Sequence, residues 1–223
     1  MVALAFAVAI GAAIALVAAA LLSRNGGEAR PANPNPTVDL AGIPQDGTLL
    51  GADSANVRLI EYADLQCPFC RDYAETVFPT LVEEYVRPGR VQAEFRGLAF
   101  LGSDSEKALR LVLAAGLQNR LWHMQEALYR NQGGENAGWV TDELVRALGE
   151  DIEGLDVDRM FEDADGAEVT ALLGESARQA QAVGVGGTPS FYIQIGEQEP
   201  YSMELEALDP SVFRPALDDA LDG

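Results

Sequence analysis

Residues 61–70 read EYADLQCPFC, and this stretch contains both cysteines of the 223-residue chain. Cys67 and Cys70 are separated by two residues, so at the first turn of a helix their thiols are close enough to form a small disulfide ring. The free N–H groups and the positive dipole end of a helix N-terminus favour a thiolate at the first cysteine. Pro68 suits the first helical position, which needs no N–H donor. The stretch therefore predicts a redox-active pair of thiols.

Two other uses of this cysteine pair stay open from the residues alone. A structural zinc site needs about four ligands, and the single His123 is the one further candidate of the cysteine or histidine type. A purely structural disulfide would contribute little, because so short a loop hardly constrains the unfolded chain. The flanking sequence favours redox chemistry, since an apolar run precedes the cysteines and a helix-like stretch follows them.

The N-terminal part of the chain differs in composition from the rest. Residues 1–22 contain no charged side chain, and this run exceeds the roughly 18 apolar residues of a transmembrane candidate. It is also longer than the ~7–15-residue core of a cleaved signal peptide, so we expect a single-pass signal-anchor, with cleavage after residues 18–20 as the alternative. Residues 23–47 are rich in Pro, Asn and Gly and predict an extended tether. Residues 48–223 are long enough for one domain with its own core.

Charge bears on the location and the partners of this domain. Arg24 and Arg30 follow the apolar run and no basic residue precedes it, which by the positive-inside tendency favours a cytoplasmic domain. However, long domains cross membranes largely regardless of charge, and thiols that exchange disulfides are most useful on the oxidising side. We therefore expect an extracytoplasmic domain held at the cell membrane. The net charge of −20 argues against nucleic acid and anionic lipid surfaces as partners.

The hydrophobic periodicity predicts both strands and helices. Strand patterns occur at residues 57–63, 91–100, 190–195 and 201–205. Helix patterns occur at residues 68–86, 103–128, 141–144 and onward, 166–183 and 209–221, with Pro79 expected to kink or break the first. In the first strand, alternation places Glu61 on the same face as Val57 and Leu59. The order predicts an α/β fold in which a mixed sheet is covered by helices on both faces.

A second motif lies far along the chain, where residues 186–192 read GGTPSFY. With this motif and EYADLQCPFC, the chain resembles the DsbA-like thiol–disulfide oxidoreductases of the thioredoxin fold, specifically their membrane-anchored bacterial branch. The resemblance runs from about residue 51 to the C-terminus. It implies a thioredoxin fold with a helical subdomain inserted at about residues 103–183, which fits the long separation of the two motifs.

The resemblance also implies roles for individual residues. Cys67 would be the attacking, exposed thiol, and Cys70 the more buried resolving thiol. Pro189 would be a cis-proline that faces the disulfide, and Thr188 would present backbone groups to an extended substrate. From the residues alone, Gly-Thr-Pro at the start of a strand also fits an ordinary turn.

Three further positions follow from the same match. Glu61 corresponds to a buried acid beneath the active site, where a carboxyl with a raised pKa could relay a proton to or from Cys70; the alternative is an ion pair with Arg58 or Arg96. Pro68 and Phe69 would contact the substrate. Phe69 occupies a place where strongly oxidising members often carry His, so the oxidising strength stays open.

Taken together, these features predict an enzyme that donates the Cys67–Cys70 disulfide to reduced or partly folded exported proteins through a mixed disulfide at Cys67. A membrane partner would have to reoxidise it, and no cofactor or metal beyond the disulfide is expected. Two alternatives remain. One is a reductase or isomerase for selected clients, and the other is a non-catalytic peptide-binding module.

Overall fold

The computed structural model describes residues 38–223 of the chain. The expected signal-anchor at residues 1–22 and the first part of the expected tether lie outside this range. Within residues 38–223, no helix has both the length and the apolar character needed to cross a membrane.

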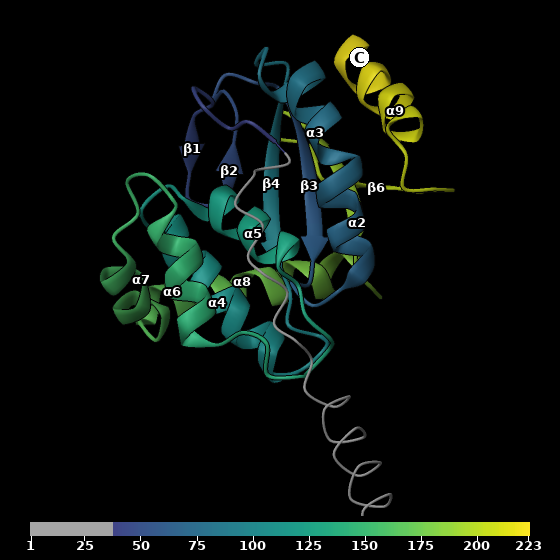
Figure 1. Ribbon diagram of the computed structural model, residues 1–223. Helices are drawn as coiled ribbons and strands as arrows, with labels where there is room; N and C mark the ends of the chain where they lie inside the picture. Colours follow the sequence, from purple (N-terminus) through teal and green to yellow (C-terminus); the bar gives the residue numbers. More distant parts are fainter. Residues whose placement is uncertain (1–37) are drawn as a thin grey trace, which may run out of the picture. The chain divides into compact units, whose positions relative to one another are not determined.

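The centre of the domain is one six-stranded sheet with the strand order β1-β2-β4-β3-β5-β6 (Figure 1). Its strands are β1 Gln45–Asp46, β2 Leu49–Leu50, β3 Val57–Ala63, β4 Val91–Gly97, β5 Ser190–Ile195 and β6 Tyr201–Met203. β3 and β4 are parallel, whereas the other neighbouring strands are antiparallel. The predicted mixed sheet is therefore confirmed, and β3 has neighbours on both sides.

The register of β3 decides what surrounds Glu61. On one side Glu61 lies opposite Phe95 of β4, and on the other side it lies opposite Phe191 of β5. Because side chains alternate along a strand, all three point to the same face of the sheet. The carboxyl group is therefore placed in a row with two aromatic rings.

The chain between β3 and β4 forms three short helical segments. These are α2 Pro68–Thr76, α3 Phe78–Leu81 and the π-helix η1 Val82–Val86. The sequence predicts one helix over 68–86 with a break near Pro79, and the break occurs at Val77, just before Pro79. Proline supplies no N–H for the preceding turn, so it is tolerated near the start of α3 and not inside a continuous helix.

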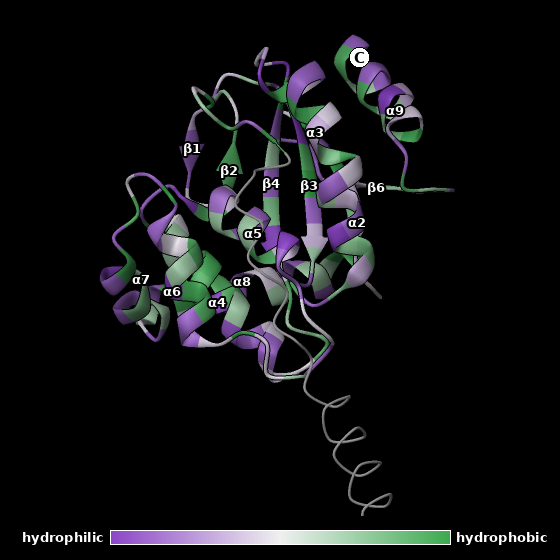
Figure 2. Ribbon diagram, viewed as in Figure 1, coloured by the Kyte–Doolittle hydropathy of each residue, from purple (hydrophilic) through white to green (hydrophobic). Residues whose placement is uncertain are grey.

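Five helices separate β4 from β5 and form the expected insertion. They are α4 Ser103–Gly116, α5 Leu121–Arg130, α6 Asp142–Glu150, α7 Val157–Ala164 and α8 Ala167–Val183, and α9 Pro210–Asp222 closes the chain. The arrowheads of β3 and β4 point toward the end of the sheet near which α4, α6 and α7 gather (Figure 1). The surface helices α7 and α9 show both hydrophilic and hydrophobic stretches, as amphipathic helices do (Figure 2).

Helices pack against both faces of the sheet. On the face that includes Glu61, Tyr73 of α2 and Phe213 of α9 form an aromatic cluster with Phe191, with ring centroids 4.5–5.5 Å apart. On the opposite face, Tyr62 and its neighbours pack against Ala180 of α8. The predicted covering of both faces is confirmed.

The domain begins earlier than the boundary expected at residue 48. Val38, Leu40 and Ile43 are buried in the main core, and the guanidinium of Arg87 donates hydrogen bonds to the backbone carbonyl oxygens of Asp39 and Ala41. Residues 38–47 therefore belong to the folded domain and not to a tether. The Pro-, Asn- and Gly-rich composition of the whole 23–47 stretch conceals these apolar residues, which are few.

Candidate active site

Cys67 lies at the N-terminus of α2, where the helix geometry predicted from the sequence is present. It is the N-cap residue in an extended conformation, and Pro68 follows in the first turn. The backbone N–H of Cys67 donates to the carbonyl oxygen of Asp64 at 3.0 Å, which closes a tight turn between β3 and α2. Cys70 lies one turn further along, and both cysteines are free thiols.

The loop before β5 contacts the first sulfur. The Sγ atom of Cys67 lies 3.3 Å from the backbone carbonyl oxygen of Thr188. The peptide bond between Thr188 and Pro189 is cis, the configuration that the resemblance implies. The structure thus brings the two motifs together at the end of the sheet where β3 leads into α2.

The two thiols differ strongly in their acidity. The pKa of Cys67 is lowered from 9.0 to about 6, chiefly by a hydrogen bond from the Cys70 thiol; the Thr188 side chain and the N–H groups of Cys70 and Phe69 add to this, against the effect of burial. Burial, followed by the hydrogen bond with Cys67, raises the pKa of Cys70 well above its ordinary value. Near neutral pH, Cys67 is therefore a thiolate and Cys70 a thiol.

The two cysteines are less exposed to solvent than the sequence suggested. Cys67 is only 4% exposed and Cys70 is fully buried. The expectation that Cys67 is an exposed residue is therefore wrong. The contact with the Thr188 loop covers one side of its sulfur. Pro68 is exposed, and Phe69 is 62% exposed, so both residues between the cysteines are open to a partner molecule.

Glu61 lies beneath the thiols in the core and is only 3% exposed. Its pKa is raised from 4.5 to about 8, first by burial and then by the negative charge of Cys67, while a hydrogen bond with the Gln125 side chain opposes the shift. A carboxyl with this pKa is protonated near neutral pH and can give up its proton.

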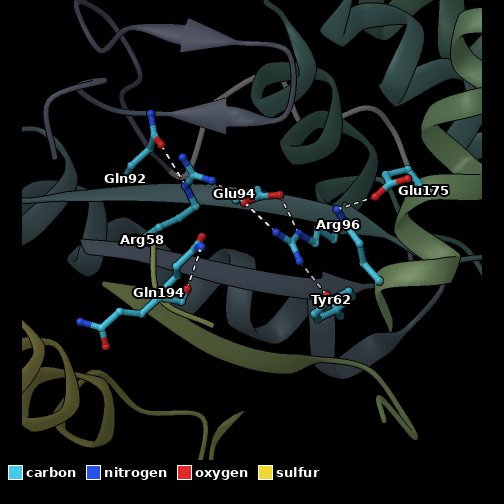
Figure 3. Close-up of polar contacts among 9 residues, drawn as sticks. Arg58, Tyr62, Gln92, Glu94, Arg96, Glu175 and Gln194 are labelled. Carbon is cyan, nitrogen blue, oxygen red and sulfur yellow. Dashed lines mark hydrogen bonds and ion pairs between the residues drawn. The ribbon is translucent and has the colours of Figure 1, made fainter. Parts of the chain in front are cut away.

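The alternative of an ion pair between Glu61 and an arginine does not hold. Arg58 and Arg96 lie on the opposite face of the sheet, where both bind Glu94, with N–O distances of 3.2 and 2.6 Å (Figure 3). Arg96 also donates to the hydroxyl of Tyr62 at 2.8 Å. Both cations are therefore engaged away from the thiols.

Helix α5 and the turn that follows it supply polar groups that the sequence interpretation missed. The side-chain amide of Gln132 donates to the carbonyl oxygens of Leu65 and Cys67 at 2.8 and 3.1 Å, and the Tyr129 hydroxyl donates to that of Asp64 at 3.4 Å. Gln125 and Tyr129 have i, i+4 spacing, which places them on one face of α5, and Gln132 lies just beyond its end. That spacing is visible in the sequence, but the interpretation of this helix used only its apolar residues.

Asp64 joins the loop after β3 to the loop after β4, although the sequence did not single it out. Its side chain is fully buried. One carboxylate oxygen accepts from the N–H of Gln66 and the hydroxyl of Ser105 at 2.8 and 2.6 Å. The other accepts from the N–H groups of Phe100 and Leu101 at 2.7 and 3.0 Å. These bonds explain why β4 ends at residue 97, before the expected residue 100.

The one histidine lies away from the thiols. Its Nδ1 atom is 3.1 Å from the side-chain nitrogen of Gln45, and its neighbours Trp122 and Met124 are core residues. Within residues 38–223, no three His, Cys, Asp or Glu side chains are grouped so that they could hold a metal ion.

The family model described as Thioredoxin matches residues 45–209. A protein of Bacillus anthracis named "Probable disulfide bond formation protein D" is 33% identical over 151 residues, which cover 65% of this chain and 68% of that protein. Among solved structures, oxidised BdbD from Bacillus subtilis is similar with a TM-score of 0.69 at 20% identity, covering 85% of this chain and all of that one. Wolbachia pipientis α-DsbA1 has a TM-score of 0.67 at 19% identity, covering 83% and 94%. At these identities, the two structures show that the fold is shared.

Proposed function

Because the chain belongs to the thioredoxin family and is a thiol–disulfide oxidoreductase of the DsbA-like group, we propose that it donates the Cys67–Cys70 disulfide to exported proteins outside the cytoplasm. The observation that carries this direction is the lowered pKa of Cys67 beside a thiol whose pKa is raised. A stable thiolate favours the reduced enzyme, and an enzyme whose reduced form is favoured gives its disulfide away readily.

The exchange proceeds in two substitutions at sulfur. A client thiolate attacks Sγ of Cys67 in the oxidised enzyme, the bond to Cys70 breaks, and a mixed disulfide with Cys67 forms. Cys70 leaves as a thiolate and takes up a proton, for which Glu61, a buried carboxyl with a pKa of about 8, is the candidate donor. A second client thiolate then attacks the client sulfur and releases the Cys67 thiolate. The client loses two electrons to the enzyme, and a membrane partner removes them to restore the disulfide.

Clients would bind along the surface that surrounds Cys67. The backbone of Thr188, beside the sulfur, can pair with an extended client segment in the manner of an added strand. Pro68 and the exposed ring of Phe69 offer an apolar contact that suits reduced or partly folded proteins. Pro189 would shape the loop that faces the disulfide.

The two cysteines can be tested separately with a reduced, unfolded model client. Cys67→Ser should abolish disulfide transfer, because the atom that is attacked is lost. Cys70→Ser, carrying an activated mixed disulfide at Cys67, should accumulate a client adduct that mass spectrometry identifies. Disulfide transfer by Cys67→Ser at the rate of the unaltered enzyme would rule out this function.

The direction of electron flow can be measured independently. The fraction of oxidised Cys67–Cys70 is determined at equilibrium in glutathione buffers of known ratio. We expect a potential more oxidising than that of thioredoxin-like reductants. A strongly negative potential would assign the enzyme to reduction or isomerisation instead.

The membrane location rests on residues 1–22 and is tested with the full chain. We expect the protein in the membrane fraction, with Cys67 in intact cells open to a thiol reagent that cannot cross the membrane. Labelling that appears only after lysis would place the domain in the cytoplasm.

A further inference from the structure

Gln132, just beyond the C-terminal end of α5, bonds the turn that carries Cys67. Its side-chain nitrogen donates to the carbonyl oxygen of Leu65 at 2.8 Å and to that of Cys67 at 3.1 Å. Both partners can only accept, so the nitrogen of the amide, and not its oxygen, must face them. The nitrogen has two hydrogens, and the two carbonyl oxygens use both. The backbone of the active-site turn therefore fixes the orientation of the Gln132 side chain.

The amide oxygen of Gln132 is left for another donor. Within residues 38–223, the hydrogen bonds of this side chain are the two from its nitrogen. The oxygen is not among the buried acceptors of this range that lack a partner, so solvent reaches it. The next two residues, Gly133 and Gly134, are exposed and have no side chains that could cover it. A client N–H can therefore replace water at this oxygen.

Cys67 lies between this oxygen and the loop before β5. Its Sγ atom is 3.3 Å from the Thr188 carbonyl oxygen, whereas its own carbonyl oxygen binds Gln132. Because both atoms belong to one residue, Oε1 of Gln132 lies within roughly 10 Å of Sγ. That distance corresponds to about three residues of an extended chain, at ~3.3 Å per residue. An extended client whose cysteine reacts at Cys67 can therefore contact both the Thr188 backbone and the Gln132 oxygen.

We propose that Gln132 is a client-binding residue whose amide oxygen accepts a hydrogen bond from a backbone N–H of the client, within about three residues of the reactive client cysteine. This inference rests on the proposed function and deepens it, because it defines a class of clients. They are extended segments that offer an N–H at this position. Proline has no N–H, so a client with proline there is disfavoured. All other residue types offer the N–H, so the contact suits an enzyme that acts on many sequences.

The two ends of the Gln132 amide have separate consequences. The nitrogen holds the active-site turn, which is a structural contribution. The oxygen carries no hydrogen, so it cannot donate to the Cys67 sulfur, and the pKa of that thiol is lowered by other groups, first the Cys70 thiol. A test of the proposal must therefore separate the contact of the oxygen with the client from the contacts of the nitrogen with the turn.

The experiment removes one client N–H at a time. Reduced cysteine peptides of one sequence are prepared in which single peptide bonds near the cysteine are replaced by ester bonds, which have no N–H. The rate constant for attack on the oxidised enzyme is divided by that for dithiothreitol, which has no peptide backbone. With the unaltered enzyme, one of the esters should lower this ratio by about 2–10-fold. In Gln132→Met, and in Gln132→Leu as a second replacement, that loss should disappear because the acceptor is already absent.

Gln194→Met is the matched control. The Gln194 amide also donates to a backbone carbonyl oxygen, that of Gln198, but it lies beside Arg58 at the start of β3, away from Cys67 (Figure 3). This variant should give the same losses as the unaltered enzyme.

A purely structural role of Gln132 would slow the peptides and dithiothreitol by the same factor and leave the losses from the esters unchanged, which would overturn the proposal. Equal losses in the unaltered enzyme and both Gln132 variants at every ester position would overturn it as well. The ratio compares two thiol reagents at the same disulfide, so it stays informative if the protein proves to be a reductant. The measured potential decides that question separately.

Discussion

The Sγ atom of Cys67 lies 3.3 Å from the backbone carbonyl oxygen of Thr188, a residue 121 positions further along the chain. The side chain of Thr188 also forms a hydrogen bond that lowers the pKa of Cys67. The Thr188 carbonyl oxygen can accept a hydrogen bond from the Cys67 sulfur only when the sulfur is protonated. The Thr188 hydroxyl can donate to the same sulfur when it is a thiolate. The loop before β5 therefore offers a partner to the sulfur in either protonation state.

Replacing Thr188 by valine should weaken the thiolate. Valine keeps the shape of the side chain but has no hydroxyl, so the hydrogen bond to the charged sulfur is lost. Such bonds contribute about 1.5–3 kcal/mol, which corresponds to a rise of about one to two units in the pKa of Cys67. The ultraviolet absorbance of the thiolate, followed against pH in the reduced protein, measures this directly. Thr188→Ser retains the hydroxyl and should titrate close to the unaltered protein, and the same pKa in all three proteins would show that the hydroxyl has no part in it.

Placing a histidine between the cysteines should act in the opposite direction. In Phe69→His, an imidazolium close to the Cys67 sulfur would stabilise the thiolate further, so the pKa of Cys67 should fall below about 6. The disulfide should become more oxidising, as measured against glutathione. Phe69→Leu removes the ring but keeps an apolar side chain, and it should leave the pKa in place. A more reducing potential in Phe69→His would contradict this reasoning.

The raised pKa of Glu61 should make folding stability depend on pH. Between about pH 4.5 and 8 the folded protein keeps the Glu61 proton while the unfolded chain has lost it. The unfolded state then binds fewer protons, so this group lowers the free energy of unfolding as pH rises through that window. Glu61→Gln removes the effect, and its stability relative to the unaltered protein should rise between about pH 5 and 8 by a few kcal/mol, on the order expected for this shift. Urea unfolding of the reduced proteins at both pH values measures the difference.

The thiolate of Cys67 changes the stability with pH in the direction opposite to Glu61. The contributions of the two groups must therefore be separated. The pKa of Cys67 is lowered from 9.0 to about 6, so its contribution is present above pH 9 and is lost as pH falls through about 6. The contribution occurs in both proteins and largely cancels in the comparison. Glu197→Gln serves as the control, because Glu197 lies in an exposed turn and the substitution removes a carboxyl that is not buried. A Glu61→Gln difference that stays constant with pH would show that the carboxyl titrates normally.

Two strands could be predicted to the residue, because each is a short run rich in apolar residues between polar or turn-forming residues. The sequence places strands at 57–63 and 190–195, and β3 and β5 have these bounds. β1 and β2 were missed, because each has two residues and no period can be read from so short an element. The π-helix at 82–86 was also missed, since its pattern of apolar residues does not differ from that of an α-helix.

The site could be predicted only where local patterns describe it. The position of Cys67 at a helix N-terminus follows from C-x-x-C and Pro68, and its meeting with the Thr188 loop was expected from the family resemblance. Gln125 and Gln132 were missed because glutamine in an amphipathic helix usually lies on the solvent side. Only the packing of α5 against α2 buries Gln125 and brings the half-buried Gln132, just after the helix, to the site.

Asp64→Asn should destabilise the loops that support Cys67 without changing their shape. The buried carboxylate accepts four hydrogen bonds, from three backbone N–H groups and the Ser105 hydroxyl. Asparagine replaces one acceptor oxygen with an NH2 donor, which then faces donors that have lost their partner. Leaving such groups unsatisfied costs about 1–3 kcal/mol each, so we expect the free energy of unfolding to fall by about 2–4 kcal/mol in urea titrations. Asp72→Asn, at a carboxylate whose side chain is 53% exposed, should change it by less than about 0.5 kcal/mol. Equal stability of the two variants would mean that the Asp64 network does not hold the two loops together, and the position of Cys67 would then depend on α2 and α5 alone.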